Sequence, residues 1–222
     1  MNIYLKFIFS LPKSICFNFR HLPFRQAVKL PFYVRYGTKV NIKGKVKLEE
    51  TSSLKMAMIV IGSHESNVSD PNHTTCLSVQ KGGELIFQKT AHIGLGTKIH
   101  VHKGARMYLG DNFAVSANSS FVCYKSMVMG RDIQFSWGCQ VMDSDTHHIY
   151  DESGKEMNPD KEVRIGDKVW IGSHVVIMKG ANIPDNCVVG ACSFVSSGNF
   201  EPNTIILGSP AKSVKKIGGW KL

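Results

Sequence analysis

Residues 165–196, IGDKVWIGSHVVIMKGANIPDNCVVGACSFVS, carry a regular interval of six within this 222-residue chain. The residues at that interval are all aliphatic and β-branched: Ile165, Ile171, Ile177, Ile183, Val189 and Val195. A period of six fits neither an α-helix nor an ordinary amphipathic strand. It indicates a solenoid in which three short strands form one triangular coil, with one aliphatic side chain per repeat in the interior. Small residues or proline often follow these positions, as expected at tight corners.

The same interval recurs less regularly upstream. It links these residues: Val40 and Val46; Ile93 and Ile99; Leu109, Val115 and Phe121; Met129, Phe135 and Val141. We therefore predict an all-β fold with a hexapeptide solenoid over residues 37–202, in which residues 62–76 form a loop or an irregular coil. The polar segment 143–163 lacks the interval, so we expect it to project as an active-site loop. Residues 203–222 form a C-terminal tail.

Residues 1–36 differ from the rest of the chain. They are rich in Phe, Leu and Ile, and Pro12, Pro23 and Pro31 are expected to interrupt any long helix. Short helical pieces that cap the first coil are one interpretation, because a solenoid needs its end covered. A patch of Phe and Lys/Arg that contacts a membrane surface is the other. The segment lacks a signal-peptide pattern and is too short to span a bilayer, so we expect a cytoplasmic protein, or one at the inner face of the membrane.

The net charge is +10, with basic residues clustered between residues 6 and 47 and again in the tail. Such clusters suit a phosphate-rich cofactor or an anionic surface. No recognition motif for nucleic acid accompanies them, so nucleic acid is not an expected partner. The six cysteines include no C-x-x-C pair and no zinc-ligand spacing, so we expect reduced thiols and no metal requirement.

Two motifs carry a family resemblance. The tract from Val169 to Gly198 begins with a W-I-G motif, and residues 202–212 read PNTIILGSPAK. Together they resemble the left-handed parallel β-helix family of hexapeptide acyltransferases, in particular sugar O-acetyltransferases of the galactoside and maltose type. Residues 1–36 look more like acyltransferases found with surface-polysaccharide biosynthesis enzymes. The resemblance implies acetyl-CoA as cosubstrate, a sugar acceptor and a homotrimer with the cofactor between subunits.

The resemblance places the catalytic base on His147, within the family pattern D-x-D-x-H. In an extended segment Asp143, Asp145 and His147 would point the same way, because side chains alternate. A carboxylate could then orient the imidazole so that its other nitrogen acts as base. His148 points elsewhere and ranks second, as a candidate for acceptor binding.

Further residues are implied by the same resemblance. The candidates for cofactor binding are Trp170, Gly172, Ser173 and Ala191 along the pantetheine arm, with Lys212 and Lys215 near the phosphates of coenzyme A. The candidates for acceptor binding are Asn118 and Trp137, together with His148. Relatives often have Thr-Lys where this chain has Ser196-Ser197, so one cationic contact of the family is absent.

Four alternatives stay open. The acceptor could be an amine of an amino sugar or an antibiotic instead of a hydroxyl. Cys139 could form a covalent acyl-enzyme. A metal hydratase of the γ-carbonic-anhydrase type shares the helix, although His147 has no histidine partner at that enzyme's spacing and His100 and His102 are only two apart. A catalytically silent scaffold is the fourth. Whether a sugar acceptor is nucleotide-linked, lipid-linked or polymeric is open, as is the length of the acyl group.

Overall fold

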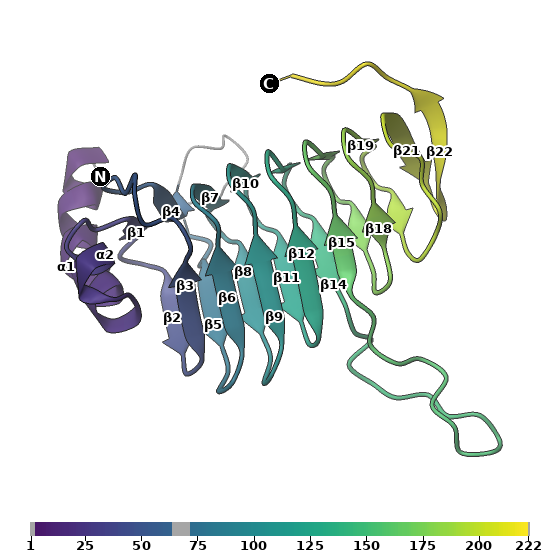
Figure 1. The fold of residues 1–222 in the computed structure, drawn as a ribbon, viewed down its shortest axis with the longest axis horizontal. Coiled ribbons are helices and arrows are strands. Elements are labelled where there is room, and N and C mark those ends of the chain that lie inside the picture. Colours follow the sequence, from purple (N-terminus) through teal and green to yellow (C-terminus); the bar gives the residue numbers. More distant parts are fainter. Residues whose placement is uncertain (1–2, 64–71, 222) are drawn as a thin grey trace.

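The computed structural model describes residues 3–63 and 72–221, with the side chains of residues 3–7 left out. The chain winds into a triangular left-handed parallel β-helix, with two helices at one end and the C-terminal tail at the other (Figure 1). The prediction of an all-β solenoid is confirmed.

Three sheets run along the axis and form the three faces of the prism. The first contains β1 (Phe32–Val34), β4 (Ile59–Ser63), β7 (Ala91–Gly94), β10 (Phe113–Val115), β13 (Gln134–Phe135), β16 (Trp170–Ile171), β19 (Val188–Val189), β21 (Thr204–Gly208) and β22 (Ala211–Lys216). The second contains β2 (Lys39–Ile42), β5 (Cys76–Val79), β8 (Lys98–Val101), β11 (Ser120–Cys123), β14 (Gln140–Met142), β17 (Val176–Ile177) and β20 (Phe194–Val195). The third contains β3 (Lys45–Leu48), β6 (Glu84–Phe87), β9 (Arg106–Leu109), β12 (Ser126–Met129), β15 (Val163–Ile165) and β18 (Asn182–Ile183).

The register explains why the interval of six is regular only near the C-terminus. Ile165 pairs with Ile183 and Ile177 with Val195, so these coils take 18 residues. Ala91 pairs with Phe113, so that coil takes 22 residues and its corners hold the surplus. Extra corner residues break the interval in the sequence without changing which side chains point inward.

The core is a column of apolar side chains inside the prism. Each of the six aliphatic residues that define the interval between Ile165 and Val195 is at most 1% exposed. Farther toward the N-terminus, Phe113, Phe121 and Phe135 fill one level of the interior, with ring centroids 5.1–5.9 Å apart. The predicted inward direction of the aliphatic residues is confirmed.

Helix α1 (Ile3–His21) lies over the first coil and contacts β1. Pro12 sits inside α1, so the expectation that it interrupts a helix was wrong. Pro12 is exposed, and the hydrogen bond that a proline removes therefore lies on the solvent side of the helix. Bonds from the opposite side of α1 to β1, described below, offset this cost. No helix among the described residues is long and apolar enough to cross a bilayer.

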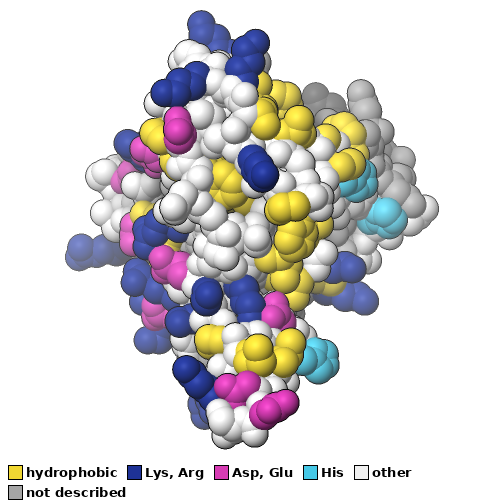
Figure 2. All heavy atoms as spheres, turned by 90° about the vertical axis from the view of Figure 1, so that its right-hand side faces the viewer, with side chains coloured by type: hydrophobic (Ala, Val, Ile, Leu, Met, Phe, Trp, Pro, Cys, Tyr) yellow, Lys and Arg dark blue, Asp and Glu magenta, His cyan; other side chains and the backbone are white. Residues whose placement is uncertain are grey.

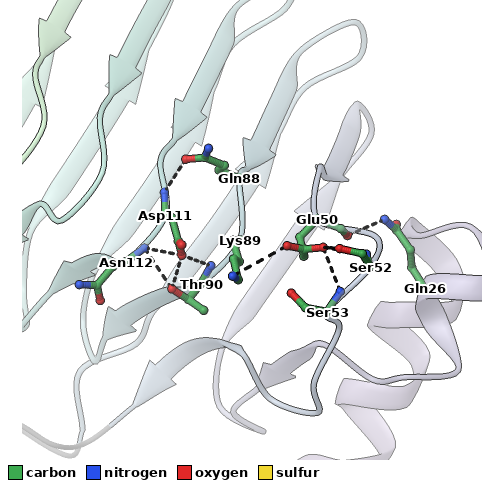
Figure 3. Close-up of polar contacts among 9 residues, drawn as sticks. All are labelled: Gln26, Glu50, Ser52, Ser53, Gln88, Lys89, Thr90, Asp111 and Asn112. Atoms are coloured by element: carbon green, nitrogen blue, oxygen red, sulfur yellow. Dashed lines mark hydrogen bonds and ion pairs between the residues drawn. The ribbon is translucent and has the colours of Figure 1, made fainter.

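Helix α2 (Phe24–Ala27) is tied to the third sheet and the corner that follows it. Gln26 donates from Nε2 to the carbonyls of Leu48 and Glu50, at 2.9 and 3.2 Å. The Glu50 carboxylate accepts bonds from Ser52 and Ser53, which lower its pKa to about 2 (Figure 3). Helix α2 is thus anchored to the first coil by polar contacts. Of the predicted irregular segment 62–76, residues 64–71 lie outside the described residues.

The tail folds back on the last coil. β22 pairs antiparallel with β21, and a cis peptide bond joins Ser209 to Pro210 in the turn between them. Trp220 then returns to the first sheet, where its Nε1 donates to the carbonyl of Lys168 at 2.8 Å.

Candidate active site

The polar segment between β14 and β15 projects from the prism, as Figure 1 shows. The backbone N–H of Lys161 donates to the carbonyl of Asp143 at 3.1 Å and closes the neck of this loop. Farther out, Tyr150 and Glu156 form an antiparallel bridge. The loop is therefore a hairpin that replaces the ordinary corner between the second and third sheets.

Asp143 is fully buried at the base of this loop. Its carboxylate accepts hydrogen bonds from the backbone N–H groups of Tyr124, Lys125 and Ser126, at 2.7–2.8 Å. These three residues form the same corner in the preceding coil. The carboxylate thus joins two coils, and the structure does not bring it to His147.

Asp145 belongs to a second polar cluster. Its Oδ2 lies 2.6 Å from Lys179 Nζ and 2.8 Å from Asn158 Nδ2. The same Asn158 amide donates to the carbonyl of His147 at 2.9 Å, and Lys179 donates to the carbonyl of Asn158 at 2.5 Å. Hydrogen bonds from Lys179 and then Asn158 hold the pKa of Asp145 below its ordinary value. This cluster fixes both arms of the loop and the backbone that carries His147.

His147 is exposed, and its Nδ1 lies 3.1 Å from Thr146 Oγ1. The expectation that Asp143 and Asp145 point toward this ring was wrong. β14 ends at Met142, and Thr146 adopts a φ of +63°, so side-chain alternation does not continue to residue 147. A hydroxyl therefore occupies the position expected for a carboxylate. In the tautomer in which Nδ1 donates to Thr146, Nε2 carries the free lone pair.

His148 points to a different partner. Its Nδ1 lies 2.7 Å from Glu156 Oε1 across the hairpin, and the side chain of His148 is 62% exposed. Exposed Tyr150 lies beside it, with ring centroids 6.3 Å apart. His148 is thus part of the hairpin and is separate from the Asp145 cluster.

The candidate cofactor residues gather at another corner, between the first and second sheets. Backbone bonds run from Cys192 N to the carbonyl of Ser173 and from His174 N to that of Trp137, so Trp137, Ser173 and Ala191 stack in successive coils. In the described residues the N–H groups of Ser173 and Ala191 have no protein acceptor, while their neighbours Gly172, His174, Gly190 and Cys192 do. The corner therefore presents a column of free donors with exposed Trp137 beside it.

Gly172 lets these coils approach closely. A Cβ at this position would lie 2.7 Å from the backbone nitrogen of Ala191 and 2.9 Å from the carbonyl oxygen of Val189. Neither atom can move without shifting the next coil. Packing between adjacent coils therefore requires the glycine of the W-I-G motif.

The remaining cofactor candidates lie on the first sheet or extend it. Trp170 is 43% exposed, donates to Ser136 Oγ at 3.3 Å and has its ring centroid 6.3 Å from that of Trp220. Lys212 and Lys215 are exposed on β22. In the view from the C-terminal end, Lys and Arg side chains gather at the top, where the tail lies (Figure 2). This end offers flexible cations for an anionic group.

Asn118 occupies the same corner column two coils nearer the N-terminus than His174. Its φ is +52°, and its Oδ1 lies 2.7 Å from His73 Nδ1. Together with Lys39, Lys98 and Ser120 the two residues line a groove of about 450 Å³. The structure therefore separates Asn118 from the loop that carries His147.

The site residues thus fall on two different edges of the prism. The loop with His147 leaves the edge between the second and third sheets, whereas Trp137, Ser173 and Ala191 lie on the edge between the first and second. A strand of the second sheet with its flanking residues separates the edges by roughly 15–20 Å. One chain alone does not bring the two groups into contact.

The structure opposes a covalent route through Cys139. Its side chain is buried, its Sγ donates to the carbonyl of Gly172 at 3.1 Å, and burial raises the pKa of its thiol. A protonated, enclosed thiol is a poor nucleophile. For metals, no group of three or more His, Cys, Asp or Glu side chains suited to an ion occurs within residues 3–63 and 72–221.

Sequence reasoning missed three residues around the loop. Thr146 contacts the His147 ring, and Asn158 and Lys179 hold Asp145. Lys179 lies at the corner of the next coil, a position that the interval of six could have indicated. For Asn158, on the far arm of an irregular loop, the sequence contains no such signal.

The comparisons with known proteins agree with this picture. Residues 162–197 match the family model described as bacterial transferase hexapeptide (six repeats). The galactoside O-acetyltransferase of Escherichia coli (strain K12) is 29% identical over 152 residues, covering 66% of this chain and 73% of that protein. The putative lipopolysaccharide biosynthesis O-acetyl transferase WbbJ of the same strain is 28% identical over 147 residues, covering 62% and 74%.

Among solved structures, the polySia specific acetyltransferase NeuO superposes with a TM-score of 0.52 at 21% identity, covering 86% of this chain and 79% of that one. At this identity the likeness shows the fold alone. With the matched repeats and the two relatives, it confirms the resemblance to hexapeptide acyltransferases drawn from the motifs between residues 169 and 212.

Proposed function

We propose that this chain, an acyltransferase built on bacterial hexapeptide repeats, transfers the acetyl group of acetyl-CoA to a hydroxyl of a sugar during surface polysaccharide biosynthesis. The observation that carries the proposal is the loop at 143–162, which holds exposed His147 next to a hydroxyl on the same solenoid as the W-I-G corner. The names of the two Escherichia coli relatives support an O-acetyl product, and the second supports a polysaccharide setting. Because acetyl-CoA is a cytoplasmic metabolite, the reaction belongs in the cytoplasm or at the inner face of the membrane.

The base in this proposal is Nε2 of His147. It removes the proton of the acceptor hydroxyl as the oxygen attacks the thioester carbonyl, and a tetrahedral oxyanion forms. The carbon–sulfur bond then breaks, and the imidazolium returns the proton to the departing thiolate. General-base help of this kind contributes about 10²–10⁴-fold. Thr146 orients the ring, and the cluster of Asp145, Asn158 and Lys179 positions the backbone that carries it.

The donors for the cofactor lie at the other edge. The free N–H groups of Ser173 and Ala191 suit the amide oxygens of a pantetheine arm, and the Ser173 N–H is a candidate for the oxyanion. Gly172 lets the two coils approach closely at this corner, and Trp170 precedes it on β16. Lys212 and Lys215 are the cations for the phosphates of coenzyme A. Trp137, Asn118 and His148 are candidates for contacts with the acceptor, which is a sugar, a nucleotide sugar or a lipid-linked saccharide.

The separation of the two edges supports a homotrimer. Since one chain does not bring His147 to the corner with Ser173, a complete site would join the loop of one copy to the corner of the next. Closed three-fold assembly repeats the same interface three times and gives three such sites.

The first experiment measures free thiol released from acetyl-CoA against a panel of sugars, amino sugars and nucleotide sugars. Wild-type turnover should require one class of acceptor, and His147→Ala should lower kcat by about 10²–10⁴-fold. His148→Ala is the comparison variant: Glu156 binds its ring, so its loss should act on the KM of the acceptor and leave kcat nearly unchanged. A large loss in His148→Ala with near-normal turnover in His147→Ala would assign the base to His148. Strict dependence on an amino sugar would replace the hydroxyl acceptor by an amine.

The shared site has its own test. The test uses two variants that each have low activity alone, His147→Ala and Lys212→Glu. The two proteins are unfolded, mixed and refolded together. In a trimer, roughly a quarter of the interfaces then combine an intact loop with an intact tail, and activity returns to that extent. Mixed samples that assemble but show no gain would contradict a site shared between copies.

A further inference from the structure

Helix α1 turns a stripe of three small polar side chains toward the solenoid. Ser10, Ser14 and Asn18 are at most 4% exposed and face β1, the edge strand of the first sheet. Asn18 donates to the carbonyl of Phe32 and accepts from its N–H, at 2.7 and 3.1 Å. Ser14 Oγ accepts from the N–H of Val34 at 2.9 Å. This polar stripe, at the helical interval of four, supplies hydrogen-bond partners to backbone groups of the edge strand, as a neighbouring strand would.

The opposite side of the helix is apolar and faces outward. Its described side chains include Ile8 at 57%, Phe9 at 59%, Ile15 at 44% and Phe19 at 47% exposure. From α2, Phe24 at 72% and Val28 at 46% extend the patch, and the Phe19 and Phe24 rings lie 6.1 Å apart. An ordinary surface helix turns its apolar side chains to the protein and its polar ones to water, whereas α1 buries a polar stripe and exposes several large apolar side chains. Contiguous exposed patches of this kind mark interaction sites.

The net charge of the chain resides in the N-terminal segment that carries this patch. Residues 1–48 contain ten Lys and Arg and no Asp or Glu, whereas residues 49–222 contain 17 of each sign. The N-terminal segment therefore holds the whole net charge of +10. Arg20, Arg25 and Lys29 lie exposed beside the apolar side chains. The partner must be apolar at its interior and negative at its surface.

We propose that the outward face of α1 and α2 docks on the surface of an anionic lipid bilayer. Ile8, Phe9, Ile15, Phe19 and Phe24 enter the boundary between headgroups and acyl chains, and the adjacent Arg and Lys side chains contact lipid phosphates. A second copy of the chain is the less suitable occupant, since it would bring two strongly positive segments together. The inference stands independently of the acyl transfer proposed above.

The experiment is vesicle cosedimentation with the full chain. Vesicles of phosphatidylcholine with phosphatidylglycerol should bind the protein, and vesicles of phosphatidylcholine alone should bind it far less. Replacing three basic side chains in Arg20→Gln/Arg25→Gln/Lys29→Gln should weaken binding to the anionic vesicles by about a hundredfold. The matched control, Lys81→Gln/Lys103→Gln/Lys155→Gln, removes three exposed lysines elsewhere and should weaken it much less.

A second variant tests the apolar side chains. Ile15→Ser/Phe19→Ser/Phe24→Ser changes only exposed positions, so the fold should remain, as circular dichroism would verify. It should lose vesicle binding, while Ile149→Ser/Tyr150→Ser/Met157→Ser, on the exposed hairpin, should keep it. Equal binding of wild type to neutral and anionic vesicles would overturn the proposal. Absence of vesicle binding would overturn it as well. If, in that case, Ile15→Ser/Phe19→Ser/Phe24→Ser lowered the sedimentation coefficient of the protein, the patch would be assigned to self-association.

Discussion

The Asp143→Ala substitution separates a structural role from a catalytic one. Its carboxylate is fully buried and accepts three backbone N–H bonds from the corner of the preceding coil. Each of these part-buried N–H groups costs about 1 kcal/mol or more when it loses its acceptor, so loss of all three bonds should lower the free energy of unfolding by about 3–5 kcal/mol. For a chain of this length that corresponds to a fall in Tm of at least about 6 °C.

The assay combines thermal unfolding with amide hydrogen exchange. The N–H groups of Tyr124, Lys125 and Ser126 should exchange much faster in Asp143→Ala, while those of distant coils such as β6 should change little. Asp145→Ala is the matched control. Its carboxylate is partly exposed and pairs with Lys179, so the expected loss of stability is at most about 1 kcal/mol.

Turnover of the Asp143→Ala protein, measured well below its Tm, should be reduced far less than that of His147→Ala. A variant with wild-type Tm and wild-type exchange at residues 124–126, but with turnover as low as that of His147→Ala, would refute this reasoning. It would place Asp143 in the chemistry of the site instead of in the corner between two coils.

Three further substitutions test other parts of the structure. The lowered pKa of Asp145 means that its bond to Lys179 adds stability above the unfolded pKa of the carboxyl and loses it as pH falls through the folded one. Proteolytic cleavage of the loop should therefore accelerate below about pH 3.8 in wild type, and already at neutral pH in Lys179→Met; equal cleavage rates would contradict the clamp. Cys139→Ala should keep nearly full kcat, because the thiol is buried and protonated; loss of the thiol-release signal would restore the covalent route. Gly172→Ala should lower the free energy of unfolding in urea by about 1–3 kcal/mol, since its Cβ meets the backbone of the next coil. Gly198→Ala, whose Cβ would make only ordinary contacts, should leave that free energy unchanged. Equal unfolding midpoints of the two variants would disprove the clash.

The regular part of the fold could be predicted because the side chain at every sixth position must enter the prism. That constraint is local and repeats, so inward-pointing residues such as Ile171 and Val189 can be recognised from the surrounding sequence alone. Upstream, corners of variable length weaken the interval, yet the inward residues such as Val115 and Phe121 were still identified. The prediction that Pro12 interrupts the helix was wrong, because a helix tolerates a proline where the lost backbone hydrogen bond faces water.

The polarity of the loop and its histidine predicted where the loop lies, but the sequence did not predict the contacts within it. Alternation predicts a neighbour only while a strand continues, and β14 ends at Met142. Asn158 and Lys179 meet Asp145 through a hairpin and through the next coil, contacts that depend on three-dimensional closure. The roles assigned to His147, Ser173 and the tail lysines remain predictions until the variants are measured.

The prism also fixes a height. Four strand spacings separate β2, in the first coil, from β14, which carries the loop. At about 4.8 Å each, with about 10 Å for the helix beneath, the loop stands roughly 30 Å from any surface on which α1 rests. A coil of this kind cannot shorten or stretch without losing its hydrogen bonds. Where that surface is a bilayer, a sugar held directly against the headgroups lies out of reach, and the outer units of a longer glycan chain lie at the level of His147.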